Sequence, residues 1–294
     1  MSRKWAAGWW RAGSRSPGNS AKSRSRKPDG LLRTAVSAAF VIAVAYAVSA
    51  AAQAPTPRIL IDQPLVAVEY QLRRLTNDEL SRVERKPGDP RYRPVYVALL
   101  TRRGLGPELR EEAVTALTKL DGISRAQLIA GTLARVPEDD PATIAALLTM
   151  MFAEPPAGFA KERALFAKLA EDSAATQAVL AAAYGAMLIA DGNADAVWPA
   201  ATERKQLAAL VRALAYIPWR GALAPMAPDV VARVTTVVED SDDPIVRSLA
   251  MAALATIRPD AASFRILAGE IVPSASFEDR DAAIRAIGTI PREV

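Results

Sequence analysis

The side chains available for chemistry in this chain are restricted by two absences. Its 294 residues include no cysteine and no histidine. These absences exclude disulfides, thiolate nucleophiles, the usual zinc sites and covalent attachment of haem c through Cys-x-x-Cys-His. They also exclude Ser-His-Asp and Cys-His catalysis, because the base is missing. General acid–base catalysis could rest only on Asp, Glu, Lys or Tyr, and an enzyme that uses carboxylates alone is the last-ranked alternative because no constellation of them supports it. We therefore predict no catalytic residue, metal site or cofactor, and we do not expect an enzyme.

Acidic segments are the remaining places where a cation site is conceivable. The run 191–195 (Asp-Gly-Asn-Ala-Asp) resembles the start of a calcium loop, but its sixth position is Ala196 and its twelfth is Thr202. A helix C-cap at Gly192 or Asn193 is the simpler interpretation. The runs 138–140 and 239–243 stand before prolines, where carboxylates favour a helix start. We prefer this capping role to cation binding for both runs.

Three arginines, Arg110, Arg247 and Arg280, occupy the same position of a repeated segment. A guanidinium fork suits a partly buried pair with a carboxylate or a carbonyl. We therefore favour an internal ladder, in which each arginine bonds an aspartate or a carbonyl in a neighbouring repeat. A row of arginines that binds a ligand is the alternative.

An aromatic group occurs near two prolines, Pro199 and Pro218. Packing in the core or between repeats is the favoured role for such residues. An exposed binding hot spot is the sharper alternative, because tryptophan, tyrosine and arginine dominate such sites. The candidate partner surface consists of Tyr216, Trp219 and Arg220, with Trp198 nearby.

The net charge of +5 is unevenly distributed along the chain. Residues 1–33 have a balance of +8, residues 34–54 carry no charge, and the remainder has a balance of −3. The basic character therefore belongs to the leader. A body that binds phosphates would need clustered Lys and Arg, so we expect no nucleic-acid partner.

Residues 1–54 have the order of a secretory signal: a basic stretch, an apolar stretch and small residues. We expect residues 1–33 to be a disordered basic leader, and residues 34–54 to be the apolar segment with its cleavage region. Cleavage after Ala52 is preferred to cleavage after Ala54, because Pro55 would hinder the peptidase at the latter. An uncleaved membrane anchor at 34–54 is the alternative. Both predict an exported protein of the periplasm or cell envelope, with membrane contact only through this segment.

The elements that position these residues are predicted from a repeat. Segments beginning at Pro107, Pro244 and Phe277 align without gaps. In the second segment Asp243 is the expected N-cap, Pro244 starts the helix, and apolar residues recur at helical spacing. Small alanines in each copy would let neighbouring helix axes approach closely. This pattern predicts one helix of a repeating helix pair.

Caps and periodicity predict further helices, and no segment has the alternation of a strand. The predicted ranges are 64–75, a short helix capped at Thr76, 92–103, 124–136, 140–152, 159–170, 174–190, 202–217, 228–239 and 260–272. The expected fold class is all-α: an α-solenoid of roughly six helix pairs over residues 55–294.

Residues 243–254 read Asp-Pro-x-Val-Arg-x-x-Ala-x-x-Ala-Leu and resemble the first helix of a HEAT repeat. This resemblance implies an armadillo-like helical array that binds proteins through its surface. The middle of the chain contains no clean copy of the motif.

The segments 68–80 and 92–100 resemble the leading part of large exported bacterial proteins, in which HEAT repeats precede a copper or haem c domain. The expected function is an exported, non-catalytic scaffold for an unidentified protein partner. The alternative is the N-terminal scaffold portion of an exported redox protein, whose partner would be a redox domain or an envelope complex. This chain lacks His and Cys, so no redox role is transferred to its residues.

Overall fold

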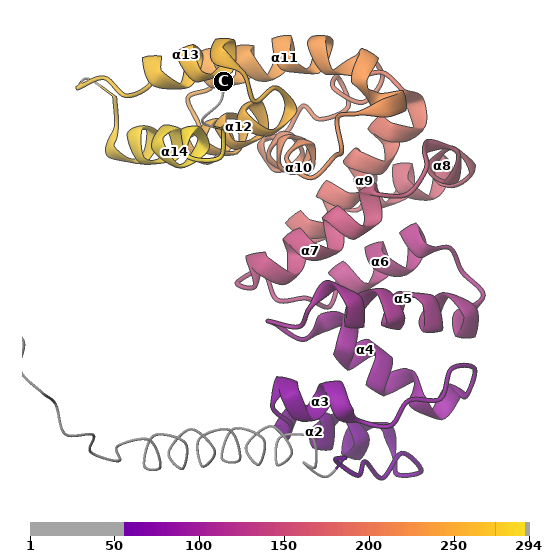
Figure 1. Ribbon diagram of the computed structural model, residues 1–294. Coiled ribbons are helices and arrows are strands. Elements are labelled where there is room, and N and C mark those ends of the chain that lie inside the picture. The colour runs from indigo at the N-terminus through magenta and orange to yellow at the C-terminus, as the bar shows by residue number, and fades with distance from the viewer. Residues whose placement is uncertain (1–55, 274, 292–294) are drawn as a thin grey trace, which may run out of the picture. The chain divides into compact units, whose positions relative to one another are not determined.

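The computed structural model describes residues 56–273 and 275–291, which belong to one compact unit, Thr56–Val294. Within these residues the chain forms thirteen α-helices and two 3-10 helices, and no strand (Figure 1). The prediction of an all-α fold is confirmed for this part. The predicted leader (1–33), the signal or anchor segment (34–54) and the cleavage position Ala52 lie outside the described residues.

The elements follow one another with short connections. They are α2 (Leu65–Arg74), α3 (Asn77–Arg82), η1 (Pro90–Tyr92), α4 (Arg93–Thr101), α5 (Pro107–Asp121), α6 (Arg125–Leu133), α7 (Pro141–Phe152), α8 (Pro156–Glu171), α9 (Gln177–Asp191), α10 (Arg204–Leu214), η2 (Gly221–Met226), α11 (Ala227–Asp240), α12 (Pro244–Ile257), α13 (Ala261–Gly269) and α14 (Phe277–Ile287).

Local sequence sets most helix starts. The side chain of Asp140 accepts a hydrogen bond from the N–H of Thr143, and that of Asp243 accepts one from the N–H of Ile245 at 2.9 Å. These bonds satisfy backbone donors that have no partner within the helix. Proline at the first position of α5, α7, α8 and α12 costs nothing, because its missing N–H would be unpaired there.

Helices close in sequence pack on one another. The pairs α4 and α5, α6 and α7, α8 and α9, α11 and α12, and α13 and α14 are in contact. Helix α10 packs against both α9 and α12, and α12 packs in turn against α14, so that α10, α12 and α14 lie side by side (Figure 1). Apolar faces are thus covered mainly by neighbouring helices along the chain.

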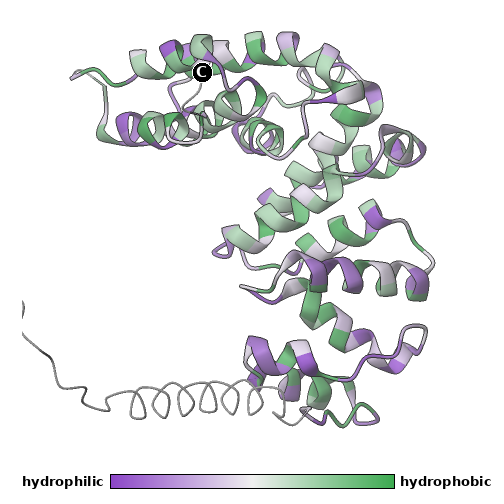
Figure 2. Ribbon diagram, viewed as in Figure 1, coloured by the Kyte–Doolittle hydropathy of each residue, from purple (hydrophilic) through white to green (hydrophobic). Residues whose placement is uncertain are grey.

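Helix α9 is the most deeply covered element. Every residue from Ala178 to Ile189 is buried, and α6, α7, α8 and α10 all contact this helix. Figure 2 shows that α7 and α9 are largely hydrophobic, whereas α3 and α5 carry more hydrophilic residues. The ring of Phe152 lies directly against Gly185, where a Cβ would meet the ring at 2.3 Å. Glycine at this position therefore permits α7 to approach α9 closely.

Several observed helices differ in length from their predicted ranges; α10, for example, covers Arg204–Leu214 where 202–217 was predicted. Helix α8 begins at Pro156, three residues before the predicted start, because Pro155 and Pro156 suit the cap and first position of a helix. Helix α13 ends at Gly269, before the predicted end at Val272. Ile271 and Val272 instead lie exposed in the following loop. Periodicity alone does not locate such an end.

In the described residues, no single helix has both the length and the apolar character of a membrane span. Helices α7 and α8 have the length and apolar character of a membrane span only when taken together, and the pair is bent by 117°.

Candidate functional site

Arg110 is an internal hydrogen-bond donor. It is only 3% exposed, and its Nη1 and Nη2 atoms donate to the carbonyl oxygens of Leu100 and Arg102 at 2.5 and 2.9 Å. Its Nη2 also reaches the Thr143 hydroxyl in α7 at 3.4 Å. Burial lowers the pKa of Arg110, while the nearby carboxylate of Asp140 opposes this shift. The side chain thus closes the C-terminal end of α4, where helix carbonyls lack partners.

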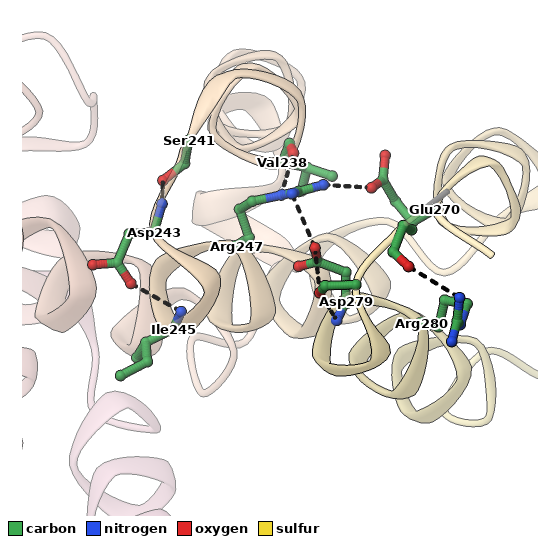
Figure 3. Close-up of polar contacts among 10 residues, drawn as sticks. Val238, Ser241, Asp243, Ile245, Arg247, Glu270, Asp279 and Arg280 are labelled. Carbon is green, nitrogen blue, oxygen red and sulfur yellow. Dashed lines mark hydrogen bonds and ion pairs between the residues drawn. The ribbon is translucent and has the colours of Figure 1, made fainter. Parts of the chain in front are cut away.

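Arg247 holds the equivalent position in α12 and has three partners (Figure 3). Its Nε donates to the carbonyl oxygen of Val238 at 3.2 Å, near the end of α11. Its Nη2 contacts Glu270 Oε2 at 2.6 Å, and its Nη1 contacts Asp279 Oδ2 at 3.1 Å. One guanidinium therefore connects α11, the end of α13 and the start of α14.

Arg280 in α14 donates to the carbonyl oxygens of Pro273 and Ala275, at 3.3 and 3.0 Å. Like Arg110 and Arg247, it is the fourth residue of its helix and bonds backbone carbonyls a few residues upstream. In all three cases the guanidinium donates hydrogen bonds to backbone carbonyl oxygens of the segment that precedes its helix. The hydrogen bonds of all three side chains go to groups of this chain.

A second relation links two of these arginines to a later helix. Arg110 contacts Thr143, 33 residues later, and Arg247 contacts Asp279, 32 residues later. Thr143 and Asp279 are both the third residue of their helices, α7 and α14, and both are buried. Helix α7 therefore holds a place equivalent to α14. This equivalence was not predicted from the sequence, although the pairs Asp-Pro at 140–141 and 243–244 are a visible signal.

Two further arginine–aspartate pairs were not predicted. Arg93 forms a bidentate pair with Asp121, and Arg163 forms one with Asp191, each across 28 residues. Both aspartates end a helix and precede a left-handed glycine, a conformation that glycine adopts without a Cβ penalty. The repeated Asp-Gly with an arginine 28 residues earlier was the available signal.

The acidic residues of the run 191–195 pair with arginines of this chain. Asp191 pairs with Arg163, Gly192 adopts a left-handed conformation with φ 63°, and Asp195 pairs with Arg233. Among the residues that the structure describes, no group of three acidic side chains is placed to hold a metal ion.

The residues of the predicted partner surface lie in different environments. The indole N–H of Trp219 donates to the carbonyl oxygen of Leu214 at 2.9 Å, and Trp219 and Tyr216 both pack on the core. Tyr216 and the exposed Arg220 line a hollow of about 320 Å³, which the α7–α8 connection completes with Glu154 and Pro155. Trp198 lies apart from this hollow, with Arg233 over its ring.

A larger groove, of about 550 Å³, lies between α10 and α12. Its lining consists of Gln177, Glu203, Arg204, Lys205, Ala208, Arg212, Ile245, Val246 and Leu249. This groove was not predicted from the sequence. The line Arg204, Ala208, Arg212 at helical spacing was a partial signal, whereas nothing in the sequence placed Gln177 beside it.

Comparison of the chain with protein-family models, with curated proteins and with solved structures finds no match.

Proposed function

We propose that this chain is an exported, non-catalytic scaffold of HEAT-like helix pairs that holds a protein partner. One observation carries the proposal: three helices share one register in sequence, in burial and in hydrogen bonding. Ala113, Ala250 and Ala283 are all fully buried, three residues after the three arginines described above. A unit that recurs with the same buried residues is typical of a helical-repeat array.

Pairwise packing of successive helices also supports an array. Each repeated helix, α5, α12 and α14, packs on the helix just before it. In such arrays each unit buries its apolar face against the next one, which leaves an extended surface for partners. Composition supports a non-catalytic role, because the sequence lacks His and Cys and leaves only Asp, Glu, Lys and Tyr for acid–base catalysis.

Export is proposed from the order of residues 1–54, with cleavage after Ala52. The test is fractionation of the native host, followed by mass determination of the mature N-terminus. A mature chain in the envelope fraction that begins at Gln53 supports a cleaved signal. An intact N-terminus in the membrane fraction supports the anchor, and a cytoplasmic chain would overturn the proposal of export.

The scaffold role is tested by site-specific photo-crosslinking in the envelope. A crosslinking residue replaces Arg220 at the hollow or Ile245 at the groove, and the exposed Lys119 of α5 serves as the control position. We expect one partner protein to be recovered from at least one of the first two positions and not from Lys119. Absence of any specific adduct would contradict the scaffold role.

The identity of the partner separates the two forms of the proposal. A c-type haem protein or a copper protein in the adduct would favour the scaffold portion of a redox assembly. A partner without a redox centre would favour a general interaction scaffold.

A further inference from the structure

The groove between α10 and α12 combines an apolar floor with three basic side chains and one acidic side chain, Glu203. Ala208, Val246 and Leu249 line its apolar part, and Ile245 beside them is 56% exposed. In Figure 3 the Ile245 side chain points away from the Arg247 network. Ile245 and Leu249 are one helical turn apart, so they present one apolar line along α12.

Two of the basic side chains, those of Arg204 and Arg212, come from one face of α10. Arg204, Ala208 and Arg212 are spaced by four residues and therefore share that face, which extends over about 12 Å. Arg204 is paired with Asp243, and Lys205 Nζ donates to the carbonyl oxygen of Ser173 at 2.9 Å. The charges of Arg204 and of Asp243 thus offset each other.

Arg212 differs from these two side chains. It is half-buried and lines the groove, yet it makes no hydrogen bond or ion pair with any residue from 56 to 273 or from 275 to 291. A guanidinium carries five N–H donors and no acceptor, so it suits a carboxylate bound through two parallel hydrogen bonds. The same groove also leaves a buried acceptor unmatched within the described residues, since Gln177 Oε1 has no partner there.

The groove thus offers an apolar line next to a half-buried cation whose donors are unused. We propose that it docks an acidic amphipathic helix of a partner protein, an inference that rests on the proposed scaffold function. Aliphatic side chains one turn apart would cover Ile245 and Leu249, and a carboxylate on the adjoining face would pair with Arg212. Helices commonly bind in grooves in this way, through anchors spaced by three and four residues.

The test uses the purified full chain and a display library of helical peptides of about 15 residues. A peptide of this length can sustain a helix on a surface. Selection is expected to enrich peptides with aliphatic residues one turn apart and a net negative charge. A second version of the best peptide, with lysine in place of its acidic residues, is the charge control. This control should bind at least about tenfold more weakly, and the difference should shrink at high salt.

Three variants locate the binding site. Arg212→Glu and Ile245→Asp should each weaken binding of the selected peptide by about tenfold or more. Arg265→Glu, which makes the same charge change on the exposed face of α13, should leave binding unchanged. Because Arg212 has no partner in the described residues and Ile245 is exposed, both variants should keep the wild-type circular dichroism and melting temperature.

Several outcomes would overturn the proposal: no enrichment of acidic peptides, equal binding of the lysine control, or peptides that bind the Arg212→Glu variant as tightly as the wild type. A dimer in sedimentation that Ile245→Asp dissociates would assign the groove to a second copy of this chain. If these tests fail while photo-crosslinking still recovers one partner, the groove proposal falls and the scaffold function stands. If crosslinking yields no partner, the scaffold function falls whichever peptides the groove binds.

Discussion

Arg247 of α12 and Asp279 of α14 form a partly buried ion pair, with Nη1 and Oδ2 separated by 3.1 Å. The same Oδ2 accepts a hydrogen bond from the Ser276 hydroxyl at 2.8 Å, while Oδ1 has no partner among the described residues. Val238 and Glu270 complete the ring of acceptors around Arg247. This arrangement fixes α14 to α12 through a charge at the start of α14.

We expect Asp279→Ala to lower the free energy of unfolding by about 1 to 3 kcal/mol, because it removes one charged hydrogen-bond partner of the partly buried Arg247. The double variant Arg247→Met/Asp279→Ala should lose less than the sum of the two single variants, because Arg247→Met alone leaves the carboxylates of both Asp279 and Glu270 unpaired, whereas the double variant leaves only that of Glu270. Chemical denaturation of the four proteins measures this coupling. Strict additivity would show that the pair contributes no mutual stabilisation.

Arg110 should be intolerant of substitution, including substitution by lysine. Arg110→Met leaves the carbonyl groups of Leu100 and Arg102 without donors and should cost about 2 to 3 kcal/mol. Arg110→Lys should recover only part of this loss, because a single ammonium does not reproduce the fork. The control is Arg285→Met, which removes an exposed pair with Asp281 and should change stability by about 0.5 kcal/mol or less. A similar loss for both positions would contradict the assigned role of Arg110.

Two glycine-to-alanine substitutions should change the stability of the protein in opposite directions. Gly185→Ala in α9 would place a Cβ against the ring of Phe152, and we expect a loss of about 1 to 3 kcal/mol from overpacking. Gly131→Ala in α6 meets no atom within 4 Å and should stabilise the protein by about 0.5 to 1 kcal/mol through helix propensity. Thermal melting of the two variants distinguishes these effects, and equal shifts would show that α7 and α9 are not in close contact.

Stability should decline in acid partly through Asp121. The hydrogen bonds from Arg93 lower the pKa of Asp121, and burial opposes this only in part. A carboxyl with a lower pKa in the folded state contributes stability above its unfolded pKa of about 4, and this contribution is lost as the pH falls through the folded value. Asp121→Asn should therefore be less stable than the wild type at pH 7, and the difference should narrow below about pH 4. A difference that does not change with pH would contradict this assignment.

The sequence by itself determined the helical class and most helix starts in the described residues. Caps such as Asp243 and Thr76, and prolines at first helical positions, act within a single turn, so local residues suffice to predict them. The common position of Arg110, Arg247 and Arg280 was also visible in the sequence, because the three segments that contain these arginines align without gaps. The calcium-like run 191–195 was also interpretable locally, as the end of a helix.

Tertiary structure decided which groups meet across helices. Nothing local shows that Arg247 bonds Glu270 and Asp279, which lie 23 and 32 residues further along the chain. The groove next to Arg212 likewise exists only because α9, α10 and α12 converge there. The physical reason is one of range: caps and propensities act over one or two turns, whereas burial and pairing depend on how side chains from distant segments fill shared space.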